Sequence, residues 1–230
     1  LDLQSVVDEL WQSFREETDF LVEARNLEEF RRNNSGCVYL ECPKPYPALC
    51  TRHVVVMDYV DGVAIDDTAE LTAQGYDCAE IGEKLMDNYA SQMLDDGFFH
   101  ADPHPGNLVV SGGKIVYMDL GIMGRLNAGD RRCVSDMVMA VARRDSAGLA
   151  DGLLRFSVGD TSEVDYAHLL GELDAIIANS GAADLSDLDI GGFVNSLVTM
   201  ARRNGIELPS SVTMLARALV TLEGVVDNLL

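Results

Sequence analysis

The sequence predicts an α+β protein in which short strands lie between helical segments. Apolar residues recur at three- and four-residue steps before residue 33 and again beyond residue 125, as in amphipathic helices. Between these stretches, two short apolar runs flank Ser111, Gly112 and Gly113, which is typical of a β-hairpin. With 230 residues, 47% of them hydrophobic, the chain is long enough to bury a sizeable core.

Charge and composition exclude two broad classes of function. Lysine and arginine total 17 against 38 aspartates and glutamates, so the net charge is −21 and a nucleic-acid backbone would be repelled. The longest apolar runs, such as residues 54–57, are far shorter than the roughly 20 residues of a membrane-spanning helix. We therefore expect no nucleic-acid partner and no transmembrane segment in this chain.

The cysteines and the first residues of the chain predict its compartment and its relation to a longer protein. Five thinly spread cysteines, an odd number, predict a reducing compartment. The sequence opens on Leu1, already in a helical pattern, so we expect it to be a piece of a longer protein.

The first helix is expected to end at about Arg32, because turn residues occupy positions 33–36. Pro43, Pro45 and Pro47 then forbid a regular helix. The β-branched run 53–59 is expected to form a buried strand that stops at Asp61 and Gly62.

A second helix is expected from about Tyr76 to Asp96, closed by Gly97. The hairpin strands are expected over residues 107–110 and 114–118. Later helices are expected near residues 128–144, 146–157, 163–179, 191–204 and 210–227.

Asp102, Asn107 and Asp119 form the most informative constellation in the chain. Adjacent antiparallel strands lie about 5 Å apart, so Asn107 and Asp119, at the two ends of the hairpin, are expected side by side. Amide and carboxylate oxygens suit Mg²⁺. Asp102, on the preceding loop, could orient or deprotonate an attacking hydroxyl. Each residue alone would be an ordinary turn residue, but the joint spacing matches the catalytic and metal-binding loops of kinase-fold phosphotransferases.

Two zinc sites are weaker alternatives. The first would use His100, Asp102 and His104, but Pro103 and Pro105 prevent the helix that would bring the two histidines onto one face. The second would use the set Cys37, Cys42, Cys50 and His53, which lacks the close cysteine pairs of structural zinc sites.

Several motifs together resemble the UbiB/ADCK family of atypical kinase-like proteins. They are residues 98–107, residues 119–124, Glu17-Thr18-Asp19, Glu23-Ala24-Arg25-Asn26 and the strand that leads into Gly62. The resemblance covers about residues 16–224. It implies a protein-kinase-like fold, mainly the helical C-terminal lobe over residues 63–230, with a remnant of the N-terminal lobe over residues 1–62.

The resemblance also implies roles for individual residues. Asp102 corresponds to the catalytic-loop aspartate, and Asn107 and Asp119 to the Mg²⁺ ligands. Glu23 takes the place of the helix glutamate that pairs with the nucleotide-binding lysine. Glu17 and Asp19 form the acidic pair that distinguishes the family.

Residues 53–62 resemble the strand and hinge that hold adenine in kinase folds. Met57 would lie at the back of the pocket, and the backbone of Asp58 and Val60 would meet the adenine edge.

The function that the resemblance implies is that of an atypical kinase or ATPase that binds Mg²⁺ and ATP and supports isoprenoid quinone or other lipid metabolism. Its expected partners are a lipid or quinone precursor and lipid-biosynthesis enzymes, in the bacterial cytoplasm or at its membrane, or in mitochondria or plastids. Two alternatives stay open. One is a small-molecule phosphotransferase of the aminoglycoside or choline kinase type, and the other is a nucleotide-responsive scaffold that transfers no phosphate.

The chain departs from ordinary protein kinases in three ways. All three lysines, Lys44, Lys84 and Lys114, follow Glu23, so the partner lysine is absent from this chain. Ala101 stands where those kinases carry an arginine, and their Ala-Pro-Glu motif is missing. We therefore expect a protein substrate to be disfavoured and this chain alone to be inactive.

Overall fold

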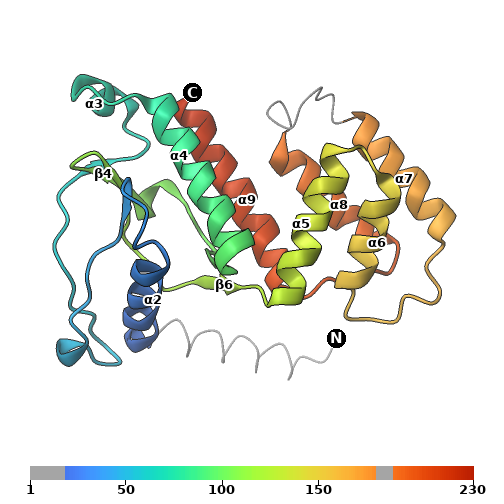
Figure 1. Ribbon diagram of the computed structural model, residues 1–230, viewed down its shortest axis with the longest axis horizontal. Helices are drawn as coiled ribbons and strands as arrows, with labels where there is room; N and C mark the ends of the chain where they lie inside the picture. Colours follow the sequence, from blue (N-terminus) through green and yellow to red (C-terminus); the bar gives the residue numbers. More distant parts are fainter. Residues whose placement is uncertain (1–18, 180–188) are drawn as a thin grey trace. The chain divides into compact units, whose positions relative to one another are not determined.

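The computed structural model describes residues 19–179 and 189–230, which form two compact units (Figure 1). Among these residues, the first unit contains 19–85, 103–123 and 228–230, and the second contains 86–102 and 124–227. The expected boundary at residue 62 separates the two lobes of a kinase fold, whereas these units are defined by their internal contacts, so that boundary stays a prediction.

The first unit is built around a four-stranded sheet in the order β1-β5-β4-β2. Strands β4 and β5 form the predicted hairpin, with Leu108 opposite Tyr117 and Ser111 opposite Lys114. Gly112 and Gly113 connect them with φ of 55° and 79°, a backbone conformation that glycine adopts without strain. The four strands are β1 (Leu40–Glu41), β2 (Val63–Ala64), β4 (Leu108–Ser111) and β5 (Lys114–Tyr117).

Helix α2 (Phe20–Asn33) packs its apolar side against this sheet. The rings of Phe30 and Tyr117 lie 5.1 Å apart between centroids, and both side chains are buried. Two short helices complete the unit, η1 (Pro47–Leu49) and α3 (Thr68–Ala73), and helix α4 (Cys78–Ser91) begins in it.

The second unit is mainly helical and carries its own core. Its later helices are α5 (Ala128–Ala142), α6 (Ser146–Phe156), α7 (Tyr166–Asn179), α8 (Ile190–Arg203) and α9 (Ser210–Leu229). Helix α5 packs on α6, α6 on α7 and α7 on α8. Leu149, Leu169 and Leu173 are fully buried in the core that these helices enclose.

Short elements connect the end of α4 to strand β4. Helix α4 continues into a π-helical turn, η2 (Gln92–Asp96), which ends at Gly97 in the left-handed conformation. Strand β3 (Phe98–His100) follows and pairs with β6 (Met123–Arg125). Between them, the 3₁₀ turn η3 (Pro105–Asn107) leads into β4.

The α+β class and most predicted elements are confirmed. The helix over about 76–96, the hairpin and the later helices are all present, within a few residues of the expected bounds. Residues 3–18 of the first expected helix lie outside the described residues. The short elements α3, β1, β2, β3 and β6 were not predicted.

The strand expected over residues 53–59 is wrong. The structure has only two isolated bridges there, Pro45 with Met57 and Thr51 with Val54. The N–H groups of Tyr46 and Asp58 do bond across this pair of segments. Directly after Tyr46 the chain turns into η1 (Pro47–Leu49), so the ladder does not continue.

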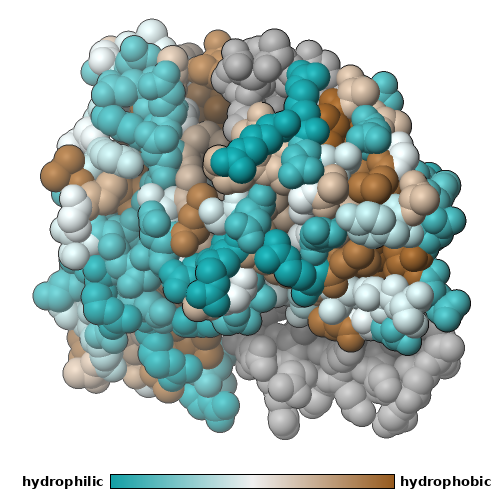
Figure 2. Space-filling view, turned by 45° about the vertical axis from the view of Figure 1, so that its right-hand side comes forward, coloured by the Kyte–Doolittle hydropathy of each residue, from teal (hydrophilic) through white to brown (hydrophobic). Residues whose placement is uncertain are grey.

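The surface agrees with the acidic composition. On the face drawn in Figure 2, hydrophilic residues cover much of the described surface, with apolar residues among them. Of the helices that the structure describes, none combines the length and apolar character needed to cross a membrane.

Candidate functional site

Asn107 and Asp119 lie at the open end of the hairpin. The Met118 N–H donates to the Asn107 carbonyl at 2.9 Å, one step beyond the Leu108–Tyr117 pair, so Asn107 and Asp119 are close neighbours in the register. Asp119 is exposed, and its Oδ1 accepts from the Gly121 N–H at 2.8 Å, which fixes the turn after β5. The backbone register therefore places the two residues near each other in the chain fold, and their joint role as metal ligands stays a prediction.

Glu23 reaches the same turn from helix α2. Its side chain is buried, and burial raises the pKa of its carboxyl to about 7. The nearby charge of Asp119 adds to this rise, whereas a hydrogen bond from the Leu120 backbone opposes it. Two acids therefore lie close together at this site.

Asn26, one turn further along α2, makes the second contact to this segment. Its amide Nδ2 donates to the Leu120 carbonyl at 2.7 Å, and the side chain is buried. Glu23 and Asn26 are three residues apart and share one helix face. Asn26 had no predicted role, and the signal that could have found it is a polar residue on the buried face of an amphipathic helix.

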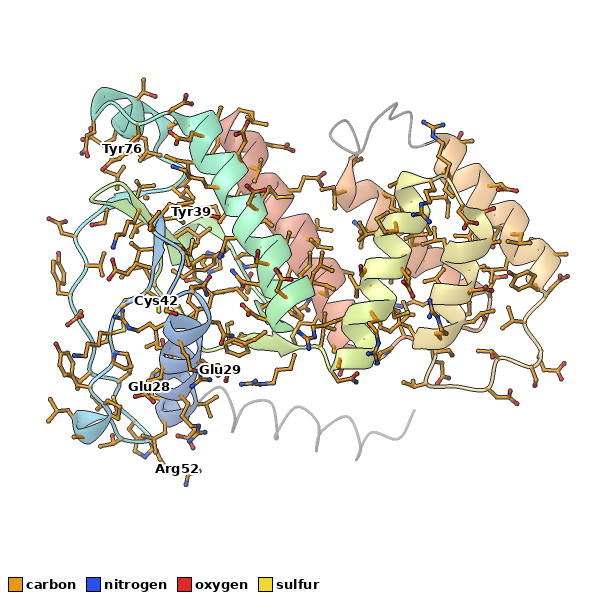
Figure 3. All side chains as sticks on the ribbon, in the orientation of Figure 1. Glu28, Glu29, Tyr39, Cys42, Arg52 and Tyr76 are labelled. Carbon is orange, nitrogen blue, oxygen red and sulfur yellow. The ribbon has the colours of Figure 1, made fainter. Side chains whose placement is uncertain are left out.

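Asp19 serves as the N-cap of α2. Its Oδ1 accepts from the Leu21 N–H at 3.1 Å, and its Oδ2 lies 3.2 Å from Nε of Arg52. Arg52, labelled in Figure 3, also accepts a hydrogen bond at its carbonyl from the Phe20 N–H. Glu17, the other member of the expected acidic pair, lies outside the described residues.

A pocket of about 380 Å³ lies along the expected hinge. It is lined by residues 55–60 together with Met118, so it contains all three expected hinge positions, Met57, Asp58 and Val60. The Asp58 N–H donates to the Lys44 carbonyl at 2.9 Å. Of the Asp58 backbone groups, only the carbonyl is then left to hydrogen-bond to the edge of a bound base.

The Asp58 side chain is also fixed. Its Oδ1 accepts from the Tyr46 hydroxyl at 2.6 Å, and the ammonium of Lys44 lies 5.6 Å from the centre of the Tyr46 ring. These contacts hold the segment around residue 58 against the proline-rich segment before it.

Asp102 belongs to the second unit, at the end of the segment that contains β3. Its side chain is exposed, and its N–H donates to Nδ1 of His100 at 3.0 Å. The structure thus defines its local surroundings, and its catalytic role stays a prediction.

The zinc alternatives find no support. Within residues 19–179 and 189–230 there is no cluster of three His, Cys, Asp or Glu side chains that could hold a metal ion. Both histidines of the first set use Nδ1 for local turns: His100 accepts from Asp102, and His104 accepts from the Gly106 N–H. All five cysteines are free thiols.

The donor set near Asp119 fits Mg²⁺. Asn107 and Asp119 offer hard oxygens, and Mg²⁺ is commonly held by one or two protein groups, with water and phosphate completing its shell.

The fold and these positions define a kinase-like class of protein. A solved structure from Mycobacterium tuberculosis, the complex of Rv3197 with erythromycin, is similar over 99% of this chain and 58% of its own, with a TM-score of 0.61 and 18% identity. This likeness supports the protein-kinase-like fold.

Family membership follows from the sequence comparisons. The profile of the ABC1 atypical kinase-like domain matches residues 1–152, and that of the UbiB helical domain matches residues 173–230. The chain therefore belongs to the UbiB/ADCK family of ABC1 atypical kinase-like proteins, which confirms the resemblance noted from its motifs.

Individual relatives agree with this assignment. A Clostridium pasteurianum protein named for the hydrogenase 1 5′ region is 31% identical over the whole chain, which spans 43% of that relative. The probable protein kinase UbiB of Sodalis glossinidius is 31% identical over 96% of the chain and 41% of its own length. The chloroplastic ACTIVITY OF BC1 COMPLEX KINASE 1 of Arabidopsis thaliana is 29% identical over 96% of the chain and 32% of its own length.

Proposed function

We propose that the protein binds Mg²⁺-ATP and acts as an atypical phosphotransferase or ATPase in isoprenoid quinone or other lipid metabolism. The observation that carries this proposal is the pocket that residues 55–60 form with Met118, the residue directly before Asp119. A pocket at the expected hinge thus adjoins the turn that carries the Mg²⁺-type donors.

Each residue has a distinct part in this proposal. The Asp58 carbonyl and the Val60 backbone would bind the edge of the adenine, with Met57 at the back of the pocket. Asn107 and Asp119 would hold Mg²⁺, which supplies charge neutralisation at the phosphates when bound. Asp102 would orient or deprotonate the acceptor hydroxyl or water.

Glu23 would form an ion pair with a lysine outside this chain. The pKa of about 7 supports this role, because burial and the charge of Asp119 disfavour the charged form of Glu23, and a cation would favour it. Asp19 and Glu17 would form the acidic pair of the family.

The metabolic role and location rest on the family and its relatives. A chloroplastic relative favours an organellar location in a eukaryotic source, and UbiB relatives in bacteria favour a cytoplasmic or membrane-associated one. A lipid or quinone precursor and enzymes of lipid biosynthesis are the proposed partners.

A nucleotide-responsive scaffold is the second candidate function. The charge of Asp119 beside the buried Glu23 carboxyl favours it, because phosphate transfer needs positive charge around the phosphates.

Comparing two measurements on Asp102→Asn in the full-length protein separates the two functions. For an enzyme, we expect ATP turnover to fall by roughly 100-fold or more while the affinity for Mg²⁺-ATP changes little. Turnover equal to that of the unmodified protein would exclude a catalytic role for Asp102 and favour the scaffold.

A further inference from the structure

Two buried side chains hold the backbone of His100 in the second unit. The His100 N–H donates to Oε1 of Gln92 at 3.0 Å, and the His100 carbonyl accepts from the Tyr89 hydroxyl at 2.7 Å. Gln92 is fully buried, and Tyr89 and His100 are each 1% exposed. Both backbone groups of one residue are therefore bound by the helical segment that precedes it in the chain.

Asn88 fixes the orientation of the Gln92 amide. Gln92 Nε2 donates to Asn88 Oδ1 at 2.7 Å, and Asn88 is also buried. An N–H group can only donate, so the Gln92 amide must present its oxygen to His100 and its NH₂ group elsewhere. Asn88, four residues earlier, accepts from that NH₂ group and so keeps the oxygen directed at His100.

The helix changes its geometry at Gln92. This residue is the first of the π-helical turn η2, which separates the regular part of α4 from Gly97 and strand β3. Single π-helical turns inserted in α-helices occur frequently at functional sites.

The network continues from His100 to Asp102. The Asp102 N–H donates to His100 Nδ1 at 3.0 Å, which requires the ring to carry its proton on Nε2. A hydrogen-bonded path thus runs from Asn88 through Gln92 and His100 to the backbone of Asp102. Apolar side chains could fill the same volume, but they would not fix the backbone at one place.

We infer that Gln92 is a positioning residue for Asp102, supported by Asn88 and Tyr89. It holds the His100 backbone, and the His100 ring in turn holds the Asp102 backbone, so that the carboxylate meets the acceptor in one geometry. The inference rests on the proposed role of Asp102, and it adds the part of the protein that sets the geometry of that residue.

Two variants of the full-length protein test the inference through turnover. Gln92→Met keeps the length of the side chain but cannot accept from His100, and Tyr89→Phe removes a single hydroxyl. Displacement of a reacting group by about 1 Å can cost up to roughly 100-fold in rate, so we expect Gln92→Met to lower ATP turnover by roughly 10- to 100-fold. Tyr89→Phe should lower it less, and the KM for ATP should stay within roughly threefold in both variants.

Hydrogen exchange provides a readout that does not depend on activity. Exchange of the His100 amide should become roughly tenfold faster or more in Gln92→Met, because its acceptor is lost, while the Val110 amide in β4 should keep its rate. The expected result is thus a local change at residues 100–102.

Two control variants separate positioning from a general loss of stability. Tyr166→Phe removes an exposed hydroxyl that donates to Asp151 at 3.0 Å in another part of the second unit. Leu173→Ala opens a cavity in the helical core and is studied at a temperature where its loss of stability matches that of Gln92→Met. Both should keep their turnover and a slow His100 amide.

The outcomes distinguish this inference from the proposed function. Unchanged turnover and slow His100 exchange in Gln92→Met would overturn the inference, as would an equal loss of turnover in Leu173→Ala. If Asp102→Asn itself kept full turnover, the proposed function would fail, and the exchange rates would still decide whether Gln92 holds the loop.

Discussion

Glu23 is the residue at which burial and charge conflict most directly in the first unit. Its carboxyl titrates near pH 7 in the folded chain, against an ordinary value of 4.5. Between these two pH values the folded state binds more protons than the unfolded state, so the free energy of unfolding falls as the pH rises from about 4.5 through 7. Each step of one in pKa corresponds to about 1.4 kcal/mol, so ionised Glu23 costs the folded chain at most about 3.5 kcal/mol.

We therefore expect Glu23→Gln to stabilise the 230-residue chain at pH 8 by at most about 3.5 kcal/mol and to change little at pH 4.5. Urea denaturation between these pH values measures the difference. Glu28→Gln, at an exposed position on the same helix (Figure 3), is the matched control and should show no such trend. A constant difference between Glu23→Gln and the unmodified chain across this range would contradict the account.

At the residue scale, the sequence predicts the polar positions near Asp119 but not their partners. Asn107, Asp119 and Glu23 follow from spacing and from the family motif. The contact of Asn26 with the Leu120 carbonyl and that of Arg52 with Asp19 join positions far apart in the chain. Such contacts depend on tertiary packing, which local periodicity does not encode.

At the scale of single elements, helix α8 depends on a cap from another helix. Glu223 in α9 accepts from the Ile190 N–H at 2.6 Å and from the Gly191 N–H at 2.7 Å, while Asp189 accepts from the Gly192 N–H. These carboxylates bind three N–H groups that have no acceptor within the helix itself, at the positive end of its dipole.

Glu223→Ala should therefore lower the free energy of unfolding by about 2 kcal/mol, because two partly buried N–H groups lose a charged acceptor. Glu163→Ala, at an exposed position outside the helices, should change it by less than about 0.5 kcal/mol. Urea denaturation of the two variants makes the comparison, and equal stabilities would argue against the cap.

Strands β3 and β6 approach each other so closely that Gly124 cannot carry a side chain. A Cβ at this position would overlap the ring of Phe99, which is fully buried. Gly124→Ala should thus destabilise the protein by about 1–3 kcal/mol through overpacking. At Gly171, in α7, a Cβ would meet nothing within 4 Å, so Gly171→Ala should stabilise the helix by about 0.5–1 kcal/mol. Thermal unfolding should show shifts of opposite sign in the two variants.

The elements that the sequence misses are the short ones. Helices α4 to α9 carry enough turns for their apolar period to be visible, and the hairpin carries its glycine turn. Strands β1 and β2 contain two residues each, too few to show any alternation. The apolar run 53–59 looks like a strand, but the segment opposite it turns away into η1, so only isolated bridges form.

At the scale of the whole molecule, the charge balance limits nucleotide binding by this chain alone. Glu23 and Asp119 face a polyanionic ligand, and the three lysines of the chain all follow Glu23. We expect the 230-residue chain to bind Mg²⁺-ATP at least roughly tenfold more weakly than the full-length protein, because an added lysine would offset this repulsion. Calorimetry of both proteins at equal Mg²⁺ and salt tests this, and equal affinities would show that the hinge pocket and the metal ligands suffice.

The central claim is that the open end of the hairpin, with Asn107 and Asp119, and the hinge pocket form one Mg²⁺-dependent nucleotide site. Calorimetric titration of ATP into the full-length protein and its Asp119→Asn variant, each with Mg²⁺ and with a chelator, tests it most directly. We predict that binding by the unmodified protein requires Mg²⁺ and that Asp119→Asn weakens it by roughly tenfold or more, since a charged metal ligand is lost. Binding that is equally tight in the variant, or equally tight without Mg²⁺, would contradict the claim.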